Sequence, residues 1–560
     1  MPVTIGTAGH IDHGKTRLVE ALTGKNTDRL PEERRRGISI ALGYAPLVLP
    51  DGRRLSLVDV PGHERFVRTM VAGATGIDRF LLVVDAAEGA RPQTHEHLAI
   101  LRLLGIERGV VAVTKADVVD EERLELALEE ARDLVPGAET VAVSAKTGAG
   151  LDELRAAIAR VATGRDRGQT PDTATTRLYV DRVFSLPGIG TVATGTMWSG
   201  TIAAGDVLRV EPRGLEARVR SVEVHDEEVV RAEAGQRVAV ALVGVERTAI
   251  RRGDALVTAG AFPTSYRLDV ALRELEPVSD GARVVVHHGT TAVPARVARI
   301  GAGYAQLRLD RPLVTARGDR VVLRGETTLG GGLVVDPDPP RTRDEARVEA
   351  AARGDARAVV HEPVRERDLV LRGLDPSGLV RAGGWAFSQA WLDRLGEDLR
   401  RRIAASDPLD PGIPPPPEPW STAVVPLLGL ERRGAKLVLP GAAPELGARA
   451  GEADRLETEL AAAGYEPVPI RDTRLAVFLE ERGSAVRVGD GLALSRDAYD
   501  EARRLLVAEC EAAGSITLAR FRDLLGTSRR PAQLLLERFD ADGITRRTGD
   551  ARVLRRAARA

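Results

Sequence analysis

The residues best suited to chemistry lie near the start of the chain. Residues 9–16 read GHIDHGKT, which matches the pattern GxxxxGK[ST], and they stand between a β-like run and a helical stretch at Thr16–Thr23. In such a loop the glycines let backbone N–H groups curl around phosphates, and the helix N-terminus adds a favourable dipole. The Lys15 ammonium can reach the outer phosphates, and the Thr16 hydroxyl can ligate Mg²⁺. The predicted phosphate site comprises Gly9, His10, Ile11, Asp12, His13, Gly14, Lys15 and Thr16.

A second polar run is placed to read the state of the bound phosphates. Asp59-Val60-Pro61-Gly62 follows the strand-like run Leu55–Val58. A carboxylate at Asp59 can hold Mg²⁺ through water, and the Gly62 N–H can sense a γ-phosphate. The pattern DxxG is common by itself, but its position behind a phosphate loop makes it specific.

Two later runs indicate which base is bound. One ends the apolar strand Val110–Val113, and the other follows a further strand. In the first of them, the Asp117 carboxylate can accept hydrogen bonds from guanine N1–H and its exocyclic amine, a pairing that adenine does not offer. Because all four runs end predicted parallel strands, they meet at one edge of a sheet. The predicted guanine contacts are Thr114, Lys115, Asp117, Ser144, Ala145 and Lys146.

Lysine usage supports the same site. Of 80 basic residues only five are lysine, and the rest are arginine. Three of the five fall inside the lysine-bearing runs described above, which indicates that these positions resist arginine because a compact ammonium is needed there. The five are Lys15, Lys25, Lys115, Lys146 and Lys436.

Length, charge and cysteine content limit the remaining possibilities. A chain of 560 residues predicts three to five domains, and a net charge of −1 gives no global basic field, so any nucleic-acid site must be local. With Cys510 as the single cysteine, disulfides and a cysteine-based zinc site are excluded. The first residues do not resemble a signal peptide, and no apolar stretch is long enough to span a membrane. These observations favour a cytoplasmic protein with no membrane partner.

The order of predicted elements indicates several domains. Residues 1–165 alternate β-like runs with helical stretches, which predicts a parallel, doubly wound sheet. Short β-rich runs predict two antiparallel β-barrels, at 175–258 and 259–338. Beyond a linker at 336–343, helix–helix–hairpin patterns predict winged-helix-like units at 341–505 and a terminal winged-helix unit at 506–560. The predicted fold class is therefore multidomain: an α/β P-loop GTPase domain, two antiparallel β-barrels and three or four α+β winged-helix repeats.

The first domain resembles the translational GTPases related to elongation factor Tu. The resemblance rests on GHIDHGKT, on Arg36-Gly37-Ile38-Ser39-Ile40 and on the run DVPGHERF. It implies ribosome-stimulated hydrolysis of GTP to GDP and phosphate, with GTP or GDP and Mg²⁺ as cofactors. It assigns to His63 the positioning of the attacking water. Thr16 and Ser39 would ligate Mg²⁺ directly, and Asp59 would do so through water.

Two residues depart from that family. Ser39 stands in place of threonine and keeps the hydroxyl for Mg²⁺. Thr114 stands where many GTPases have an asparagine whose amide braces the base, so this support is lost.

Later parts of the chain resemble the bacterial selenocysteine-specific elongation factors. The resemblance rests on Asp181-Arg182, on Gly235-Gln236-Arg237 and on Ile516–Leu554; it covers essentially the whole chain and is loose between 341 and 450. It implies delivery of selenocysteyl-tRNA to the ribosome at UGA codons marked by an mRNA hairpin. It also implies that Asp181, Arg182 and Arg237 line a pocket for the aminoacyl end of the tRNA.

The chemistry of these three residues fits such a substrate. A selenol is largely ionised near neutral pH, whereas a serine hydroxyl is not, so a desolvated cationic pocket can distinguish them. Arg182 and Arg237, oriented by Asp181, can favour an anion and penalise a neutral hydroxyl. A barrel salt bridge without a ligand is the alternative interpretation of the same residues.

The C-terminal end is locally basic. Ser515–Ala560 holds eleven arginines and five acidic residues, a balance of +6. Such a surface can bind RNA phosphates, and arginine can stack on unpaired bases, although arginine is also the default cation of this chain. The family resemblance assigns this end to binding the mRNA hairpin. The candidate mRNA contacts are Arg522, Arg529, Arg530, Arg546 and Arg547.

Three functional hypotheses remain open at the level of sequence. The first is a monomeric GTPase that delivers selenocysteyl-tRNA, with the tRNA, the mRNA hairpin and the ribosome as partners. The second is a general tRNA-delivering or initiation GTPase with an RNA-binding extension, which the length of the C-terminal region disfavours. The third is an RNA-binding scaffold with a vestigial GTPase site. Against the scaffold stand the intact Lys15, Thr16, Asp59, His63 and Asp117.

Overall fold

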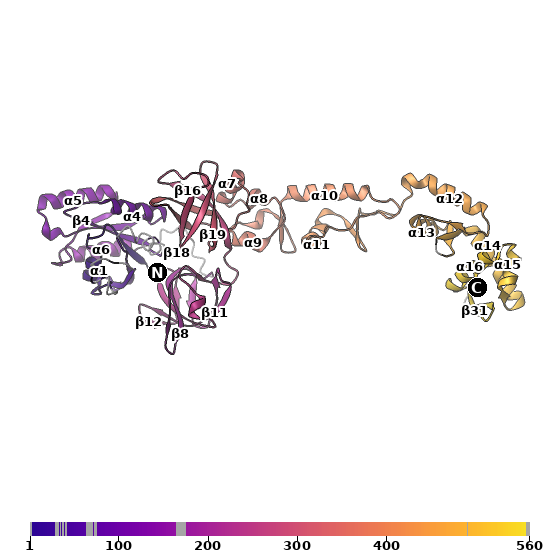
Figure 1. The fold of residues 1–560 in the computed structure, drawn as a ribbon, viewed down its shortest axis with the longest axis horizontal. Helices are drawn as coiled ribbons and strands as arrows, with labels where there is room; N and C mark the ends of the chain where they lie inside the picture. The colour runs from indigo at the N-terminus through magenta and orange to yellow at the C-terminus, as the bar shows by residue number, and fades with distance from the viewer. Residues whose placement is uncertain are drawn as a thin grey trace. The chain divides into compact units, whose positions relative to one another are not determined.

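The computed structural model describes residues 3–28, 33, 35, 39, 42–62, 71, 76–163, 175–489 and 491–555. The chain divides into two compact units, Met1–Ala386 and Phe387–Ala560 (Figure 1). The predicted catalytic residue His63 and most of the expected linker after residue 163 lie outside the described residues. Within the described part of the chain, no helix combines the length and the apolar character needed to cross a membrane.

The first domain is a six-stranded sheet covered by helices on both faces, as the sequence predicted. Its elements are β1 (Thr4–Ala8), α1 (Lys15–Thr23), β2 (Gly43–Val48), β3 (Arg54–Asp59), β4 (Arg79–Asp85), α4 (Pro92–Leu103), β5 (Gly109–Thr114), α5 (Glu121–Leu134), β6 (Glu139–Ala142) and α6 (Leu151–Val161). The strand order is β2-β3-β1-β4-β5-β6, with β2 antiparallel at one edge and the other neighbours parallel. Residues such as Leu98 of α4 and Ala127 of α5 pack on one face. Leu18 of α1 and Leu154 of α6 pack on the other.

The second domain is a closed six-stranded antiparallel barrel. Its strands are β7 (Arg177–Leu186), β8 (Gly190–Ser199), β10 (Val207–Glu211), β11 (Leu215–Val224), β14 (Arg237–Val243) and β15 (Ala255–Val257), closed by the pairing of β10 with β11. Strand β11 shows why the sequence forms a barrel, because its buried positions alternate with exposed ones and Ala217 and Val219 point into the core. Strand β15 belongs to this barrel because it pairs with both β7 and β10, and it ends one residue before the limit of 258 expected for the first barrel.

The third domain is also a closed antiparallel barrel. Its strands are β16 (Thr264–Glu274), β17 (Arg283–His288), β18 (Thr291–Ile300), β19 (Tyr304–Val314), β20 (Arg320–Arg324) and β21 (Thr328–Asp336). They close in the order β16-β19-β18-β17-β20-β21 around an aliphatic core that includes Val286, Leu307 and Leu323. The two predicted barrels are therefore confirmed.

A winged-helix unit completes the first compact unit. It comprises α7 (Glu345–Arg353), α8 (Ala356–Val359), β22 (Val364–Arg365), α9 (Glu366–Leu371), β23 (Val380–Ala382) and β24 (Trp385–Phe387). A buried ionic network joins it to the third domain: Arg347 of α7 pairs with Asp269 of β16 and lies 3.1 Å from Asp336 of β21. Arg372 also binds Asp336, at 2.6 Å. Burial raises the pKa of Asp269 to about 6 even with Arg347 beside it.

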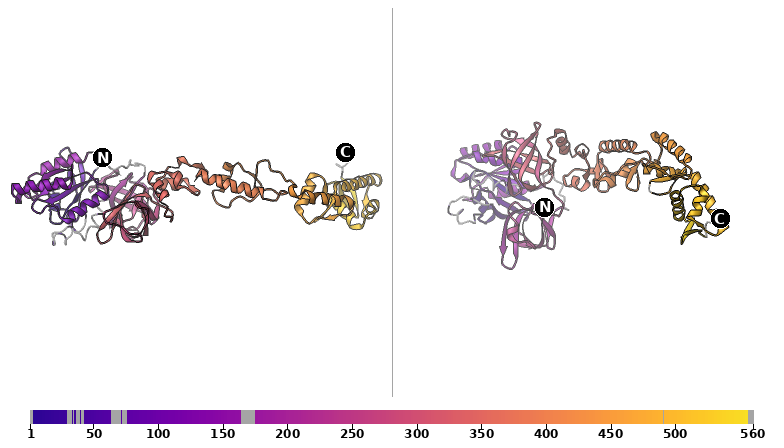
Figure 2. Two further views of the ribbon diagram at one scale, coloured as in Figure 1. Left: turned by 90° about the horizontal axis from the view of Figure 1, so that it is seen from above. Right: turned by 45° about the vertical axis from the view of Figure 1, so that its right-hand side comes forward.

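The second compact unit contains three further helix-and-hairpin units that follow one another along the chain (Figure 2). The first of these has α10 (Gln389–Ala404), α11 (Ser421–Val424), β25 (Glu431–Arg433) and β26 (Lys436–Val438). The next has α12 (Ala450–Ala462), β27 (Val468–Pro469), α13 (Thr473–Arg482), β28 (Ala485–Arg487) and β29 (Leu492–Ser495). With the unit in the first compact unit and the terminal one, the described residues hold four winged-helix-like units.

The terminal unit contains α14 (Arg496–Ala513), β30 (Ile516–Thr517), α15 (Leu518–Leu525), α16 (Arg529–Ala541), β31 (Thr545–Thr548) and β32 (Ala551–Leu554). Its helices share one apolar cluster, to which Leu506, Phe521 and Phe539 belong. The domain limit expected at 506 falls inside α14, because the Ser495 hydroxyl caps this helix by accepting from the Ala498 N–H and the helix continues to Ala513.

Candidate functional site

The phosphate loop lies between β1 and α1, as its sequence predicted. Gly9 has a φ of 130°, and a Cβ there would lie 2.2 Å from the carbonyl oxygen of Val83, so only glycine fits. Lys15 is buried, and its Nζ donates to the carbonyl oxygens of Gly9 (3.0 Å) and His10 (2.5 Å). Burial lowers the pKa of Lys15 to about 8. The ammonium therefore lies beneath the loop whose backbone would surround a phosphate chain.

Hydroxyl and carboxylate oxygens gather next to this loop. The Thr16 hydroxyl donates to Asp59 at 2.7 Å and lies 2.9 Å from the Ser39 hydroxyl. All three residues predicted for Mg²⁺ are thus within one hydrogen-bonded cluster. Oxygen ligands of this kind are the ones that Mg²⁺ takes in proteins, so the residues present fit the ion.

The same cluster holds two residues that sequence reasoning missed. The Thr27 hydroxyl donates to Asp59 at 2.7 Å, and the Ser39 hydroxyl donates to Asp28 at 2.8 Å. The Asp28 carboxyl is poorly solvated, and this burial raises its pKa. Neither residue belongs to a recurrent sequence pattern, and only the folded chain brings them to Asp59 and Ser39.

Gly62 lies where the backbone passes closest to the lysine. A Cβ at this position would be 2.2 Å from Lys15 Nζ and 2.8 Å from the backbone nitrogen of Ile11. The position therefore excludes any side chain, and its N–H can approach a terminal phosphate.

Two loops that follow β5 and β6 meet at the place predicted for the base. Lys115 adopts a φ of 55°, and its Nζ lies 2.6 Å from the buried Asp85 carboxylate. The Asp117 side chain is exposed on a 3-10 turn (Ala116–Val118), where a carboxylate can meet a base. The Ala116 N–H donates to the carbonyl oxygen of Val143 at 3.2 Å and joins the two loops.

The second of these loops is held by Ser144. This residue is buried, its hydroxyl accepts from the Thr147 N–H at 3.1 Å, and its carbonyl oxygen accepts from the Gly148 N–H at 2.9 Å. Ala145 is partly buried and Lys146 is exposed beside it. The geometry is that of a closed turn with its lysine free to cover a ligand.

Thr114 has a role that the sequence did not indicate. Its buried hydroxyl lies 2.8 Å from the carbonyl oxygen of His13 and 3.2 Å from that of Val84, and it can donate to either. The residue therefore braces the phosphate loop against β4 and β5. The sequence comparison pointed only to the loss of an asparagine amide, whereas the structure shows what the threonine hydroxyl does instead.

Buried histidines support the phosphate loop from below. The His97 ring on α4 accepts from the Gly9 N–H at 3.1 Å through Nδ1, and burial lowers the pKa of His97 to about 3. His13 lies 3.3 Å from the carbonyl oxygen of Val83, and burial lowers its pKa to about 4. His10 meets the His13 ring edge to face, at 5.1 Å between centroids. Through these contacts the His10 and His13 side chains pack within the loop.

The predicted aminoacyl pocket lies on the first barrel. Arg237 Nη2 donates to Asp181 at 3.1 Å, and the Thr194 hydroxyl donates to the same carboxylate oxygen at 2.6 Å. Although burial opposes it, the Asp181 carboxylate raises the pKa of Arg237. The salt bridge given as an alternative is therefore present, and its guanidinium is largely desolvated, as an anion site requires.

Two residues of the first domain complete this pocket, and sequence reasoning did not name them. The Arg237 guanidinium lies over the Tyr44 ring at 3.7 Å from its centroid, and the Tyr44 hydroxyl donates to Asp181 at 3.3 Å. Burial raises the pKa of Tyr44 to about 12. Arg182 is exposed and donates to the carbonyl oxygen of Leu42 at 3.1 Å. Because Leu42 and Tyr44 follow Ser39 closely, the segment that reaches the nucleotide site also reaches this pocket.

The terminal unit presents four of its five candidate arginines without carboxylate partners. Arg529 and Arg530 begin α16, and Arg546 and Arg547 lie on β31, all exposed. Among the described residues, no carboxylate forms an ion pair with any of these four arginines. Arg522, in contrast, is paired with Asp523 at 2.6 Å. The helix and the wing therefore carry the available positive charge.

Four family models match parts of the chain. The family model described as "Elongation factor Tu GTP binding domain" matches residues 2–163, and "Elongation factor Tu domain 2" matches 190–257. The model "Selenocysteine-specific elongation factor, beta-barrel domain" matches 265–341, and "Elongation factor SelB, winged helix" matches 508–554.

One similar protein matches over nearly the whole of both chains. The selenocysteine-specific elongation factor of Escherichia coli (strain K12) is 33% identical over 99% of this chain and 99% of its own length. The chain belongs to the selenocysteine-specific elongation factors. Within this family, the factor of Desulfomicrobium baculatum is 43% identical over 60% of this chain and 56% of its own length.

Solved structures agree with this membership. A bacterial selenocysteine-specific elongation factor, EF-Sec, is similar with a TM-score of 0.73 and 26% identity, over 99% of this chain and 100% of that one. The factor of Methanococcus maripaludis, solved with a GTP analogue, is similar with a TM-score of 0.53 and 29% identity, over 60% of this chain and 78% of that one. The chain is a translational GTPase related to elongation factor Tu, and it binds GTP and GDP.

Proposed function

We propose that this chain, bound to GTP, carries selenocysteyl-tRNA to the ribosome and is retained at UGA codons by an mRNA hairpin. The observation that carries the proposal is the buried side-chain cluster in which the Arg237 guanidinium pairs with Asp181 and lies over the Tyr44 ring. Membership of the selenocysteine-specific elongation factors supports the same function for the whole chain.

GTP hydrolysis is assigned to the first domain. Backbone amides of the phosphate loop and Lys15 bind the phosphates, and the Asp117 carboxylate selects guanine. Thr16 and Ser39 would hold Mg²⁺ directly and Asp59 would hold it through water, and the bound ion would offset the charge of the phosphates. We assign to His63, next to Gly62, the orientation of the attacking water.

Discrimination of the aminoacyl group is assigned to the first barrel. Asp181 holds the Arg237 guanidinium in place, and Tyr44 shields it from water, so an anionic selenolate gains a charge-assisted contact. A neutral serine hydroxyl gains no such ionic contact with the guanidinium. Arg182, which is exposed, adds positive charge at the entrance.

Retention on mRNA is assigned to the terminal winged-helix unit. Arg529, Arg530, Arg546 and Arg547 are exposed and carry no carboxylate partner among the described residues, so they can contact hairpin phosphates. Arg522 must first leave Asp523, and we expect it to contribute less. The proposed domain limits are 1–165, 175–258 and 259–338 for the first three domains; the winged-helix units begin at 341, and the terminal unit begins with α14 at Arg496 instead of at 506. We propose that the protein acts as a cytoplasmic monomer.

A single substitution tests the pocket. Arg237→Ala should reduce the preference for selenocysteyl-tRNA over seryl-tRNA by at least about tenfold, because one desolvated charge-assisted contact is removed. The measurement is competition binding of the two charged tRNAs to the GTP-bound protein. Arg218→Ala, an exposed change on strand β11 of the same barrel, is the matched control and should leave the ratio unchanged. An unaltered ratio in the Arg237 variant would overturn the assignment.

A further inference from the structure

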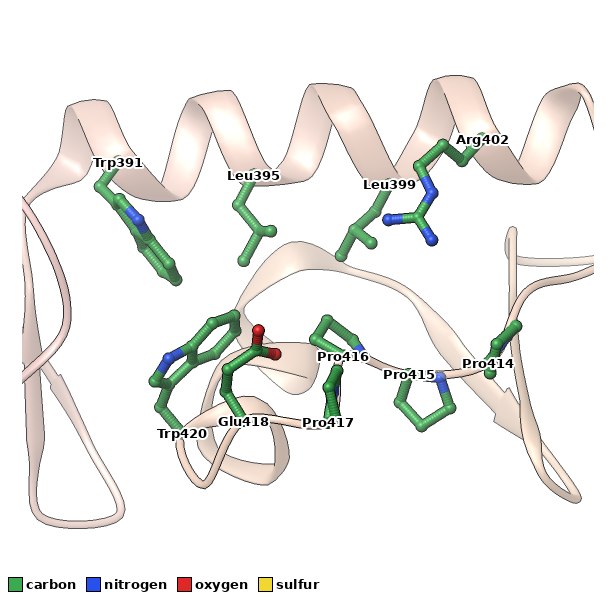
Figure 3. A pocket seen from close by; sticks show the side chains of 10 residues that line it. All are labelled: Trp391, Leu395, Leu399, Arg402, Pro414, Pro415, Pro416, Pro417, Glu418 and Trp420. Atoms are coloured by element: carbon green, nitrogen blue, oxygen red, sulfur yellow. The ribbon is translucent and has the colours of Figure 1, made fainter.

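A cavity of about 360 Å³ lies in the second winged-helix unit, residues 389–438, between α10 and the run Pro414–Pro417 (Figure 3). Leu399 of α10 faces the proline rings across it, and Leu395 faces Glu418 and Trp420. The proline run is fixed to the wing of the unit, because Ile413 and Leu437 of β26 exchange backbone hydrogen bonds of 3.0 and 2.7 Å. The cavity and the wing are therefore parts of one unit.

Two indole rings close one end of this cavity. Trp391 and Trp420 meet edge to face, with 4.9 Å between ring centroids, and both are only half-buried. Trp391 is also stacked on Phe387. Glu418 lies beside Trp420, and its exposed carboxylate has no partner among residues 387–439. This end thus offers apolar ring faces together with a hydrogen-bond acceptor.

A guanidinium stands at the other end. Arg402 of α10 is exposed, lines the cavity above Pro414 and Pro415, and has only Asp398 near it, at 3.6 Å. A ligand with a flat ring and an anionic group could stack its ring on the indoles at one end and bind its anionic group to Arg402 at the other. A nucleotide has this combination, because its base stacks on aromatic rings and its phosphate binds arginine.

The wing of this unit repeats the wing of the terminal unit. Arg432 and Arg433 on β25 are exposed and have no carboxylate partner in the described chain, as do Arg546 and Arg547 on β31. In each wing one arginine Nε donates to the carbonyl oxygen of a glycine two residues later: Arg432 to Gly434 at 3.3 Å and Arg547 to Gly549 at 3.1 Å. Arg432 and Arg547 therefore occupy the same register position, one residue before the last pair of each hairpin, and each wing carries a second exposed arginine next to it, Arg433 after Arg432 and Arg546 before Arg547.

We propose that the second winged-helix unit binds the single-stranded mRNA next to the hairpin, with one unstacked base in the Trp391–Trp420 cavity and the flanking phosphates on Arg402, Arg432 and Arg433. This inference rests on the proposed hairpin binding by the terminal unit. Bases inside a duplex are stacked and cannot enter such a cavity, whereas nucleotides outside the hairpin are free to do so. The hairpin bound by the terminal unit would hold these nucleotides at high effective concentration.

The base that enters is constrained by Glu418. A carboxylate accepts hydrogen bonds and has none to give, so it favours a base that carries an exocyclic amine over uracil. It also repels phosphate, which directs the backbone of the strand toward Arg402. The shape and charge of the cavity thus agree on one orientation of the nucleotide.

The test compares two RNAs on the full-length protein. One is the hairpin that follows a UGA codon in a selenoprotein mRNA of the source organism, with blunt ends; the other carries a single-stranded extension containing 2-aminopurine. The extension should raise affinity by about tenfold, because stacking of one base on an aromatic ring contributes on that order. Stacking on an indole should also quench 2-aminopurine fluorescence. Trp420→Ala should abolish both the gain and the quenching, and leave binding of the blunt hairpin unchanged.

A second variant guards against loss of folding in the first. Arg432→Ala combined with Arg433→Ala changes exposed side chains only and should remove most of the gain. Arg394→Ala, also exposed and on α10, is the matched control and should retain it. Glu418→Gln should reduce the preference for cytosine over uracil at the base position.

The outcomes separate this inference from the proposed function. If the blunt hairpin binds but the extension adds nothing, the inference is overturned and the proposed function stands. If the hairpin does not bind at all, the proposed function fails, and the extension alone still tests the cavity: quenching that Trp420→Ala removes supports it, and its absence overturns it. A Trp420→Ala defect confined to tRNA binding would show that the cavity takes a different RNA and would overturn the inference.

Discussion

The nucleotide site and the aminoacyl pocket are built in opposite ways. The nucleotide site uses short runs at the ends of neighbouring parallel strands, and much of its binding surface is backbone held by Gly9, Gly14 and Gly62. The aminoacyl pocket uses single side chains from separate strands, with Asp181 on β7, Arg237 on β14 and Tyr44 on β2. A site made of backbone leaves a signature in consecutive residues. A site made of side chains from separate strands has no such run of consecutive residues, and it becomes visible only when the fold brings the residues together.

The two sites also differ in how their charge is held. Lys15 lies under a loop whose supporting histidines are neutral, and burial has lowered the pKa of all three groups. The cation of the pocket is a guanidinium, whose pKa is raised by Asp181 and stays far above neutrality. The nucleotide site is thus sensitive to protons, and the pocket is not.

The largest effect is expected from removing the Lys15 ammonium, which should weaken nucleotide binding without changing the aminoacyl pocket. Lys15→Ala should weaken GTP binding by about a thousandfold, because loss of one partner in a desolvated charge contact costs several kcal/mol. The measurement is titration with a fluorescent GTP analogue. Lys25→Ala, which removes a partly exposed lysine after the same helix, is the control and should stay within about twofold of the unchanged protein. Retained nanomolar binding by the Lys15 variant would contradict the assignment.

Acid should destabilise the phosphate loop by a smaller amount. His97 and His13 are held neutral with pKa values lowered to about 3 and about 4, whereas an unfolded histidine titrates near 6.5. Since the unfolded state binds more protons between these values, the stability is fully present above about pH 6.5 and is lost as the pH falls toward 4. For the two histidines together, the loss between pH 7.5 and 5.0 should be on the order of 4 kcal/mol.

Hydrogen exchange of the β1 and α1 peptides at pH 7.5 and 5.0 measures this loss. His97→Gln should flatten the pH dependence, and the control His361→Gln, at an exposed position, should not. Equal protection of these peptides at both pH values would show that the buried histidines do not control the loop.

The smallest effect expected here concerns the shared segment. Tyr44→Leu removes the ring under Arg237 and should weaken selenocysteyl-tRNA binding by about tenfold, because a desolvated cation–π contact is worth about 1 to 2 kcal/mol. GTP affinity should change little, since Tyr44 does not contact the phosphate loop among the described residues. Tyr266→Leu, at an exposed tyrosine of the second barrel, serves as the control. A loss of GTP affinity as large as the loss of tRNA affinity would show that the two sites are coupled and are not separate binding sites.

Much of the fold could be predicted because periodicity and turn residues report local structure. The parallel sheet, both barrels and the terminal helices at Leu518–Leu525 and Arg529–Ala541 follow from alternating or helical spacing of apolar residues. Strand β15 was harder to place, since three residues carry too little pattern. The domain limit predicted at 506 falls inside α14. The whole of this helix packs in the apolar cluster of the terminal unit, and the amino-acid composition does not change where the unit begins.

The sites divide along the same line. Thr16, Ser39 and Asp59 were each predicted for Mg²⁺, and the structure brings their oxygens together. Thr27 and Asp28 join them through contacts that no local pattern encodes. Tyr44 was not predicted for the same reason: its role depends on contact with Arg237, which lies far along the sequence.

The buried ions around Asp336 decide where a shorter version of this protein can end. Asp269 and Asp336 are both inaccessible to water and are neutralised by Arg347 and Arg372, which come from the helices that follow the second barrel. Cutting the chain at the barrel's last strand would leave two carboxylates inside an apolar wall with no counterion. We therefore expect the smallest stable fragment to include the first winged-helix unit, α7 to β24, along with the GTPase domain and both barrels.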